Sequence, residues 1–297
     1  MNPIKSISTD MLDIGYCELG ATNKRVVVLL HGFPYGVEAY SEVWPRLLSL
    51  DFRVLVPFLR GYGSTRFLNS GSMRSGEQSA IAADLAAFLD TLGIDRAILA
   101  GYDWGGRAAC ILAATQPERV LGLVSGGGYN IQEIEGALDP LSPEVEKRYW
   151  YQYYFHSERG RRGLENNRKE FCKLLWKDWS PTWSFDEQTY SNTAKAFENP
   201  DFVDVVVHSY RRRFGLVAGD PRYAELSRRL ELLPSILVPS IALEGGRDGV
   251  TPVGSYSRHD GKFIGRFERR VLENVGHNLP QEDPVGFSQA IIDIAKW

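Results

Sequence analysis

Continuous apolar runs alternate with helical patterns along the first part of the chain. The runs predict strands covered on both faces, at residues 25–31, 53–59, 98–101 and 120–125. Residues 11–18 alternate weakly, as an edge strand does, and helical periodicity is found at 38–50 and 76–92. The alternation returns near the C-terminus, with strands at 240–245 and 267–272 and a closing helix at 284–297. This order predicts an α/β fold with a mostly parallel, doubly wound sheet.

The alternation stops between residues 130 and 234. This stretch shows only helical patterns, rich in aromatic residues and arginine. We therefore predict one sheet domain, residues 1–129 and 235–297, interrupted by a helical cap domain of residues 130–234. The cap would be inserted after the strand at 120–125, which follows the helix that begins at Asp103.

Composition and charge narrow the classes of function. The chain has 297 residues, of which 43% are hydrophobic and 24% charged, as in a globular protein. A formal net charge of −3 gives no electrostatic basis for binding nucleic acid or an anionic membrane. The N-terminus lacks the apolar core of a signal peptide, and no apolar run is long enough to span a bilayer. Three widely spaced cysteines indicate buried thiols in a reducing compartment, so we expect a cytoplasmic protein.

Asp103 is the centre of the segment Gly101-Tyr102-Asp103-Trp104-Gly105, between a short apolar strand and an alanine-rich helix. This spacing is typical of a nucleophile elbow with aspartate where serine usually stands. The apex residue of such a turn is strained, and the chain passes close to its neighbours, which favours glycine at 101 and 105. By itself the pattern also fits an ordinary strand-to-helix turn in which the aspartate caps the helix.

A carboxylate nucleophile indicates the kind of carbon that it attacks. Serine attacking a saturated carbon would give an ether, which water cannot reopen. Asp103 would instead give an alkyl ester whose carbonyl belongs to the enzyme and can be hydrolysed there. The expected electrophile is therefore an epoxide or an alkyl halide before an ordinary ester.

Five segments agree with this interpretation. They are His31-Gly32-Phe33-Pro34, Arg60-Gly61-Tyr62-Gly63-Ser64, and the segments 101–106, 245–252 and 276–284. Together they resemble the α/β-hydrolase family, and within it the epoxide hydrolases and dehalogenases that use an aspartate nucleophile. Nucleophile, acid and histidine come in the order expected for that fold. The resemblance implies a doubly wound sheet that carries a helical cap.

The resemblance also implies a catalytic triad. His277 is the expected general base that activates water, and Asp248 is expected to orient its imidazole. Glu244 is a rival for the acid, but it lies on a strand and not beyond its carboxyl end, where sites of parallel sheets form. The backbone N–H groups of Phe33 and Trp104 are expected to form the oxyanion hole.

The cap is expected to decide the substrate. In epoxide hydrolases of this family two cap tyrosines donate to the epoxide oxygen. Helical spacing distributes the aromatic residues of 148–156 over three faces and selects none of them. The resemblance selects Tyr154, in a Tyr-Phe pair, and Tyr210, which an arginine follows. Alternatively, these rings only pack the cap against the sheet.

Arg107 is the residue that favours an acidic substrate as an alternative hypothesis. Fluoroacetate-type dehalogenases resemble this chain in the His-Gly-Phe-Pro loop and in an arginine at the position of Arg107. They also carry an arginine directly after the nucleophile, and this arginine binds the substrate carboxylate. At that position this chain has Trp104. Alternatively, Arg107 is paired at the domain edge.

We therefore predict a hydrolase that opens an epoxide to a vicinal diol, with no cofactor and no metal. Dehalogenation by the same triad is the second hypothesis, and a non-catalytic ligand-binding member of the fold is the third. The expected partner is a small molecule, an epoxide or an alkyl halide, and a homodimer is left open. No histidine shows metal-ligand spacing.

Overall fold

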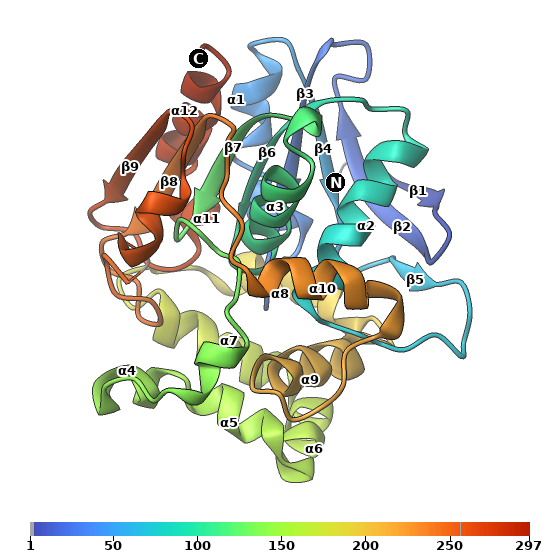
Figure 1. Cartoon of the computed structure of the whole chain (residues 1–297), viewed down its shortest axis with the longest axis vertical. Helices are drawn as coiled ribbons and strands as arrows, with labels where there is room; N and C mark the ends of the chain where they lie inside the picture. Colours follow the sequence, from blue (N-terminus) through green and yellow to red (C-terminus); the bar gives the residue numbers. More distant parts are fainter. Residues whose placement is uncertain (1–2, 256) are drawn as a thin grey trace.

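A nine-stranded sheet forms the centre of the computed structural model, which describes residues 3–255 and 257–297 (Figure 1). Its order is β1-β2-β4-β3-β6-β7-β8-β9, and β5 also pairs with β2. The strands are β1 (Ile4–Ser8), β2 (Leu12–Leu19), β3 (Arg25–Leu30), β4 (Phe52–Pro57), β5 (Arg66–Phe67), β6 (Ala97–Tyr102), β7 (Val120–Gly126), β8 (Ser240–Gly245) and β9 (Phe267–Leu272). From β4 to β9 neighbouring strands are parallel, whereas β1, β2 and β5 pair antiparallel.

The predicted parallel strands are confirmed and differ from the observed ones only at their ends. The expectation that residues 11–18 form an edge strand is wrong, because β1 pairs along the outer side of β2. β1 is almost entirely exposed, so it has no apolar pattern that could reveal it. The helix predicted at 38–50 is divided into a 3₁₀ turn (Val37–Tyr40) and α1 (Trp44–Leu48).

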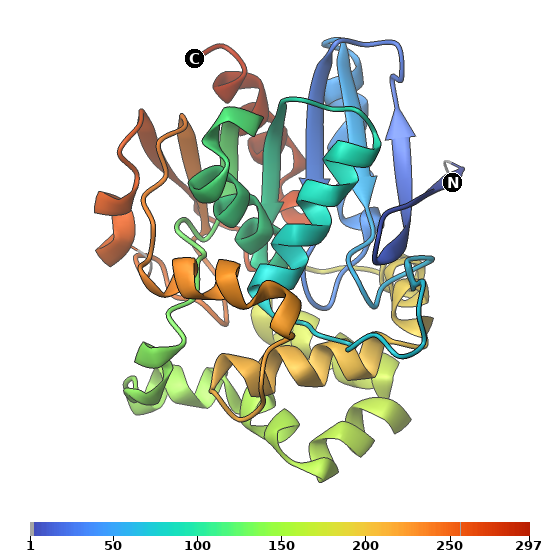
Figure 2. The same ribbon diagram turned by 45° about the vertical axis from the view of Figure 1, so that its right-hand side comes forward.

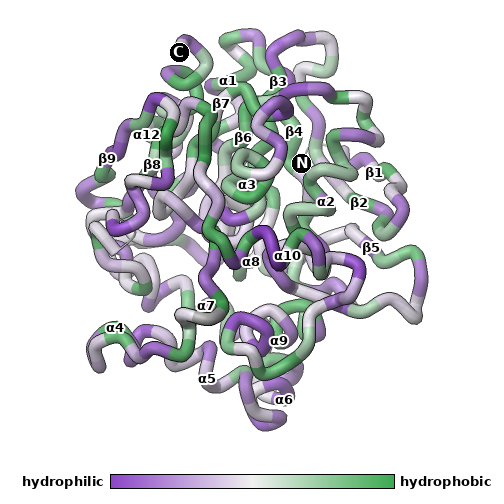
Figure 3. Tube along the Cα trace, in the orientation of Figure 1, coloured by the Kyte–Doolittle hydropathy of each residue, from purple (hydrophilic) through white to green (hydrophobic). Residues whose placement is uncertain are grey.

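Helices cover both faces of the sheet. One face carries α2 (Gln78–Thr91) and α3 (Asp103–Thr115), and the other carries α1 and α12 (Pro284–Ile294), as Figures 1 and 2 show. The central strands are buried on both sides and hydrophobic in Figure 3, as an all-parallel core requires. This doubly wound arrangement confirms the predicted fold class.

Residues 130–234, all of which the structure describes, contain helices and no strand. Hereafter we call them the cap segment. The helices are α4 (Pro143–Arg148), α5 (Trp150–His156), α6 (Glu158–Asn166), α7 (Arg168–Trp179), α8 (Glu187–Ala194), α9 (Phe202–Arg213) and α10 (Ala224–Glu231). They lie at the end of the sheet where the parallel strands finish (Figure 2). Among the described residues, none of the helices combines the length and the apolar character that crossing a membrane would need.

The turn from β6 to α3 leaves no room for side chains beside its apex. A Cβ at Gly105 would lie 2.0 Å from the carbonyl oxygen of Leu30, and one at Gly101 would lie 2.6 Å from the carbonyl carbon of Gly105. Asp103, between them, has a φ of 50°, a left-handed conformation that side chains rarely adopt. The close approach expected at both glycines is therefore present.

Gly105→Ala should destabilise the protein. The added methyl group meets backbone and not a flexible side chain, so the free energy of unfolding should fall by at least about 2 kcal/mol. Gly261→Ala is the control, because no atom lies within 4 Å of a Cβ at that position. Urea unfolding of both variants measures the difference. Equal midpoints for the two variants would contradict the steric account of the elbow.

Candidate active site

Asp103 begins α3 directly after β6, so its carboxylate lies at the helix N-terminus, where partial positive charge gathers. The backbone N–H of Phe33, in the loop after β3, donates to Asp103 Oδ1 at 2.8 Å. Gly32 lets that loop approach, because a Cβ there would lie 2.3 Å from the same oxygen. One oxygen of the carboxylate is thereby fixed, and Oδ2 faces the imidazole of His277.

His277 and Asp248 come from the loops after β9 and β8, two neighbouring parallel strands. Nδ1 of His277 lies 2.7 Å from Asp248 Oδ2, and Nε2 lies 3.7 Å from Asp103 Oδ2. The backbone N–H groups of Val250 and Thr251 donate to Asp248 Oδ1, each at 2.8 Å. Two backbone amides thus fix one oxygen of the Asp248 carboxylate, and the other oxygen binds the imidazole of His277.

The two carboxylates control the charge of the imidazole. Burial by itself lowers the pKa of His277, but the charge of Asp248 and the contacts with Asp103 outweigh burial and raise that pKa to about 10. Burial likewise opposes ionisation of Asp103, yet its pKa is lowered, because His277, Arg107 and the Phe33 N–H favour the charged form. In the resting protein a carboxylate therefore faces an imidazolium.

Phe33 and Trp104 lie together beside the nucleophile. Their buried rings stack with centroids 5.8 Å apart. Trp104 is the second residue of α3, where a backbone N–H has no partner within its own helix. The Phe33 N–H is already bonded to Asp103 Oδ1, so the structure brings both predicted oxyanion residues to the nucleophile.

Glu244, the rival for the acid, lies on β8. Its carboxylate pairs with Arg269 at 2.8 Å and accepts the backbone N–H of Gly254. Glu244 lines the cavity, but its carboxylate is already engaged. Among the described residues it forms no hydrogen bond with His277 or Asp103. Asp248 is the acid that reaches the imidazole.

Two cap tyrosines meet over Phe33. Tyr151 on α5 and Tyr210 on α9 have ring centroids 5.3 Å apart, and the Tyr210 ring lies 5.5 Å from that of Phe33. Gln152 Nε2 donates to the Tyr151 hydroxyl oxygen at 2.9 Å. Burial raises the pKa of both phenols, so both keep their protons and can donate them.

Tyr154 is not brought to this site. Its ring stacks on Phe171 of α7, with centroids 5.9 Å apart, and its hydroxyl lies against Gly163 of α6. Tyr151 and Phe155, one turn apart on α5, face Phe33, whereas Tyr154 belongs to the neighbouring face. The prediction of Tyr154 is therefore corrected to Tyr151 as the tyrosine of α5 that lies at the cavity.

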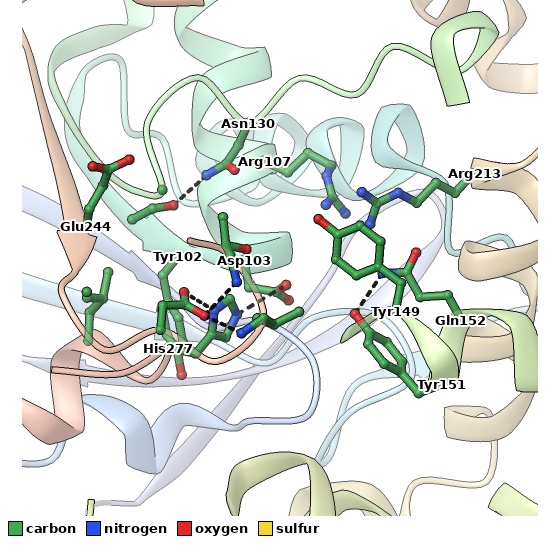
Figure 4. Close-up of a pocket in the computed structure, with 17 residues that line it drawn as sticks. Tyr102, Asp103, Arg107, Asn130, Tyr149, Tyr151, Gln152, Arg213, Glu244 and His277 are labelled. Carbon is green, nitrogen blue, oxygen red and sulfur yellow. Dashed lines mark hydrogen bonds and ion pairs between the residues drawn. The ribbon is translucent and has the colours of Figure 1, made fainter. Parts of the chain in front are cut away.

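A cavity of about 40 Å³ separates the sheet residues from the cap. Figure 4 shows Asp103 and His277 on one side, and Tyr149, Tyr151 and Gln152 on the other. A larger pocket of about 320 Å³ adjoins it. The two cavities share five polar lining residues, which form the boundary between them: Arg107, Asn130, Tyr149, Arg213 and Thr251.

Comparison with known proteins identifies the family to which this fold belongs. The family model described as alpha/beta hydrolase fold matches residues 25–284. The chain belongs to the α/β-hydrolase family. As a hydrolase of this fold, it superposes with a TM-score of 0.97 on a crystal structure from Klebsiella pneumoniae described as a "putative epoxide hydrolase". That protein is 44% identical, and the match covers 99% of this chain and 97% of the other.

Two curated relatives match parts of the hydrolase. Epoxide hydrolase 2 of Siraitia grosvenorii is 34% identical over 40% of this chain and 37% of its own length. Fluoroacetate dehalogenase of a Burkholderia species is 30% identical over 48% of this chain and 47% of its own length. In these matches the chain spans less than half the length of either relative.

Sequence reasoning missed Tyr151, Gln152 and Arg213 as cavity residues of the hydrolase. Tyr151 lies within the aromatic segment already singled out, but which face of α5 meets the nucleophile depends on how the cap packs. Arg213 is the last residue of α9 and of a run of three arginines, a pattern typical of a solvated helix face. Its side chain instead lines both cavities.

The raised pKa of His277 predicts a pH-dependent stability. An unfolded histidine titrates near pH 6.5, so the stabilisation from His277 is complete below that pH and disappears as the pH rises through about 10. Between pH 7 and pH 10 the free energy of unfolding should fall by at least about 1 kcal/mol more in the wild type than in His277→Gln. Urea unfolding at both pH values tests this. The same pH dependence in both proteins would contradict the ion pair.

Proposed function

We propose that this hydrolase opens an epoxide to a vicinal diol through a covalent alkyl ester on Asp103. The observation that carries the proposal is a carboxylate that shares a cavity with the protonated phenol of Tyr151, whose ring packs against that of Tyr210 over Phe33. A nucleophile on one side and two proton donors on the other suit an electrophile whose leaving group stays attached as an alkoxide. Relatives named epoxide hydrolases support the same substrate class.

In the first step Asp103 Oδ2 attacks a ring carbon of the epoxide. Oδ1 is held by the Phe33 N–H, so Oδ2 is the oxygen available for attack and Oδ1 becomes the carbonyl oxygen of the ester. The carbon–oxygen bond of the ring breaks, and the epoxide oxygen takes a proton from Tyr151 or Tyr210. Because Gln152 donates to the Tyr151 oxygen, the proton of that hydroxyl is left to point at the substrate.

Ester formation prepares the second step. Once Asp103 is esterified it has no charge, so His277 loses one of the two carboxylates that raise its pKa. The imidazolium then gives its proton to the tyrosinate and becomes a neutral base. His277 next takes a proton from water as the water oxygen attacks the ester carbonyl carbon, and the Phe33 and Trp104 N–H groups hold the oxyanion. As the carbon–oxygen bond to the substrate breaks, the leaving alkoxide takes the proton of the added hydroxyl and departs as the diol. Asp103 is again a carboxylate, and His277 keeps the proton that it took from water.

The cap residues select the substrate in this proposal. Residues 130–234 act as a cap domain over a core of residues 1–129 and 235–297. Arg107, from α3, lies at the boundary between the inner cavity and the larger pocket together with Arg213 from the cap. We infer that Arg107 binds a polar or acidic group of the substrate while the electrophilic carbon reaches Asp103.

Dehalogenation by Asp103, His277 and Asp248 is the second candidate function. Arg107 favours it, because a guanidinium lining the cavity suits the carboxylate of a halo acid. A relative named fluoroacetate dehalogenase points in the same direction. Trp104 stands where such enzymes would carry a second arginine, which is why the epoxide is preferred here.

Removing the two phenols should separate the candidates. Tyr151→Phe combined with Tyr210→Phe should lower diol formation from an epoxide panel at least 100-fold, because the alkoxide then has no donor. Tyr154→Phe, on the same helix but away from the cavity, is the matched control and should keep diol formation within twofold. Circular dichroism melting checks that all three proteins fold.

Each result has a separate meaning. A folded, active double variant would contradict the roles of Tyr151 and Tyr210. An equal loss in Tyr154→Phe would contradict the placement of Tyr154 away from the substrate. Halide release from a haloacid panel, with no diol from any epoxide, would replace epoxide hydrolysis by dehalogenation.

A further inference from the structure

The carboxyl end of cap helix α7 enters the space between the two loops that carry the catalytic acid and base. The carbonyl oxygen of Trp179 accepts the backbone N–H of Gly249 at 2.9 Å and that of His277 at 3.2 Å. Gly249 directly follows Asp248 in the chain. One cap carbonyl therefore binds the backbone of the base and that of the residue directly after the acid.

A buried side chain adds a second connection. The Ser180 hydroxyl, whose residue is only 1% exposed, accepts the His277 N–H at 3.1 Å and donates to Glu282 Oε1 at 2.5 Å. Glu282, on α11 (Leu279–Glu282), accepts the N–H of Gly276 at 2.7 Å and that of Asn278 at 3.0 Å. The carboxylate of Glu282 thus holds the residues immediately before and after His277.

The two loops are shaped to receive this part of the cap. A Cβ at Gly249 would lie 1.9 Å from the carbonyl oxygen of Asp178, and one at Gly276 would lie 2.6 Å from Ser180 Cα. Any larger residue at 249 would push the end of α7 away from the acid loop. We call the contacts of Trp179, Ser180 and Glu282 the α7 clamp.

We propose that Ser180 and Glu282 are positioning residues. Through the α7 clamp they hold the imidazole of His277 in place beside the ester on Asp103. The proposal rests on the proposed function, because it concerns the hydrolytic half of the reaction. His277 must aim Nε2 at a water beside the ester carbonyl, and a base displaced by about 1 Å loses on the order of 100-fold in rate. Its backbone is fixed by the clamp, and its Nδ1 is fixed by Asp248.

The clamp should matter little for the opening of the epoxide. Asp103 is positioned by the turn after β6 and by the Phe33 N–H, neither of which Ser180 or Glu282 touches. Tyr151 and Tyr210 are positioned by α5 and α9. A defect confined to ester hydrolysis therefore distinguishes a positioning role from general loosening of the cap.

Single-turnover kinetics of Ser180→Ala and Glu282→Gln test the proposal. Glu282→Gln replaces one carboxylate oxygen, which accepts from backbone N–H groups, by an amide group that donates. This variant also allows the test to be made if Ser180→Ala does not fold. With an epoxide that the wild type hydrolyses, the rate of ester hydrolysis should fall at least tenfold in each variant. Formation of the ester should stay within twofold, so that the ester accumulates on Asp103 and is visible by intact mass.

Thr182→Ala is the matched control. Thr182 lies two residues after Ser180, is exposed, and donates to the backbone oxygen of Asn274 on the same catalytic loop at 3.4 Å. Among the described residues, Thr182 forms no hydrogen bond with His277 or with its immediate neighbours. Both rates should stay within twofold of the wild type in this variant.

A substrate-independent measurement separates this proposal from the proposed function. In proteins labelled with ¹⁵N-histidine, the ring signals of His277 report its bond to Asp248 and its titration. Both should change in Ser180→Ala and Glu282→Gln and stay unchanged in Thr182→Ala. Unchanged ring signals, or equal slowing of both chemical steps, would overturn the clamp. If the wild type forms no ester with any epoxide, the proposed function fails, and the ring signals still decide the clamp.

Discussion

The carboxylate of Asp103 is a charge that the protein keeps away from bulk water. Most residues of the site stabilise this buried charge. Burying an unpaired ion is expensive, so the charge needs partners close by. The Phe33 N–H, the N-terminus of α3 and the imidazolium of His277 supply them from three different elements. The parallel sheet makes this possible, because the loops after β3, β6, β8 and β9 all leave the sheet at the same edge.

The same interaction links the two halves of the proposed reaction. In the resting state Asp103 and Asp248 share the imidazolium between them, which keeps the nucleophile ionised and the base protonated. Esterification removes one of these charges, and the imidazole becomes a base only when there is an ester to hydrolyse. The order of events thus follows from electrostatics and needs no movement of the triad.

Much of the fold was predictable because strands buried on both faces must be apolar along their whole length. β6 follows this rule throughout, and β3 and β8 follow it at Val26–Leu30 and Ile241–Leu243, whereas exposed β1 shows no such pattern. Glycine spacing predicted Asp103 at the turn after β6, whereas Asp248 and His277 were predicted from the resemblance to the α/β-hydrolase family, and the structure brings the three side chains together. Tyr154 was predicted in place of Tyr151 from the resemblance alone, because α5 carries aromatic residues on every face and only the packing against Phe33 and α7 distinguishes those faces. The clamp of Ser180 and Glu282 joins segments about a hundred residues apart, a proximity that no local pattern contains.

The central claim is that Asp103 becomes esterified, and intact mass of His277→Gln tests it most directly. Without its base the protein should retain the ester after incubation with an epoxide. The account predicts a mass increase equal to the whole epoxide, and peptide mapping should locate it on Asp103. An increase equal to a halo acid minus hydrogen halide would replace the epoxide by a carbon–halogen electrophile at the same aspartate. The contradicting result is a compound, epoxide or halo acid, that the wild type turns over but that leaves Asp103 of His277→Gln unmodified. Covalent catalysis by this residue would then be wrong.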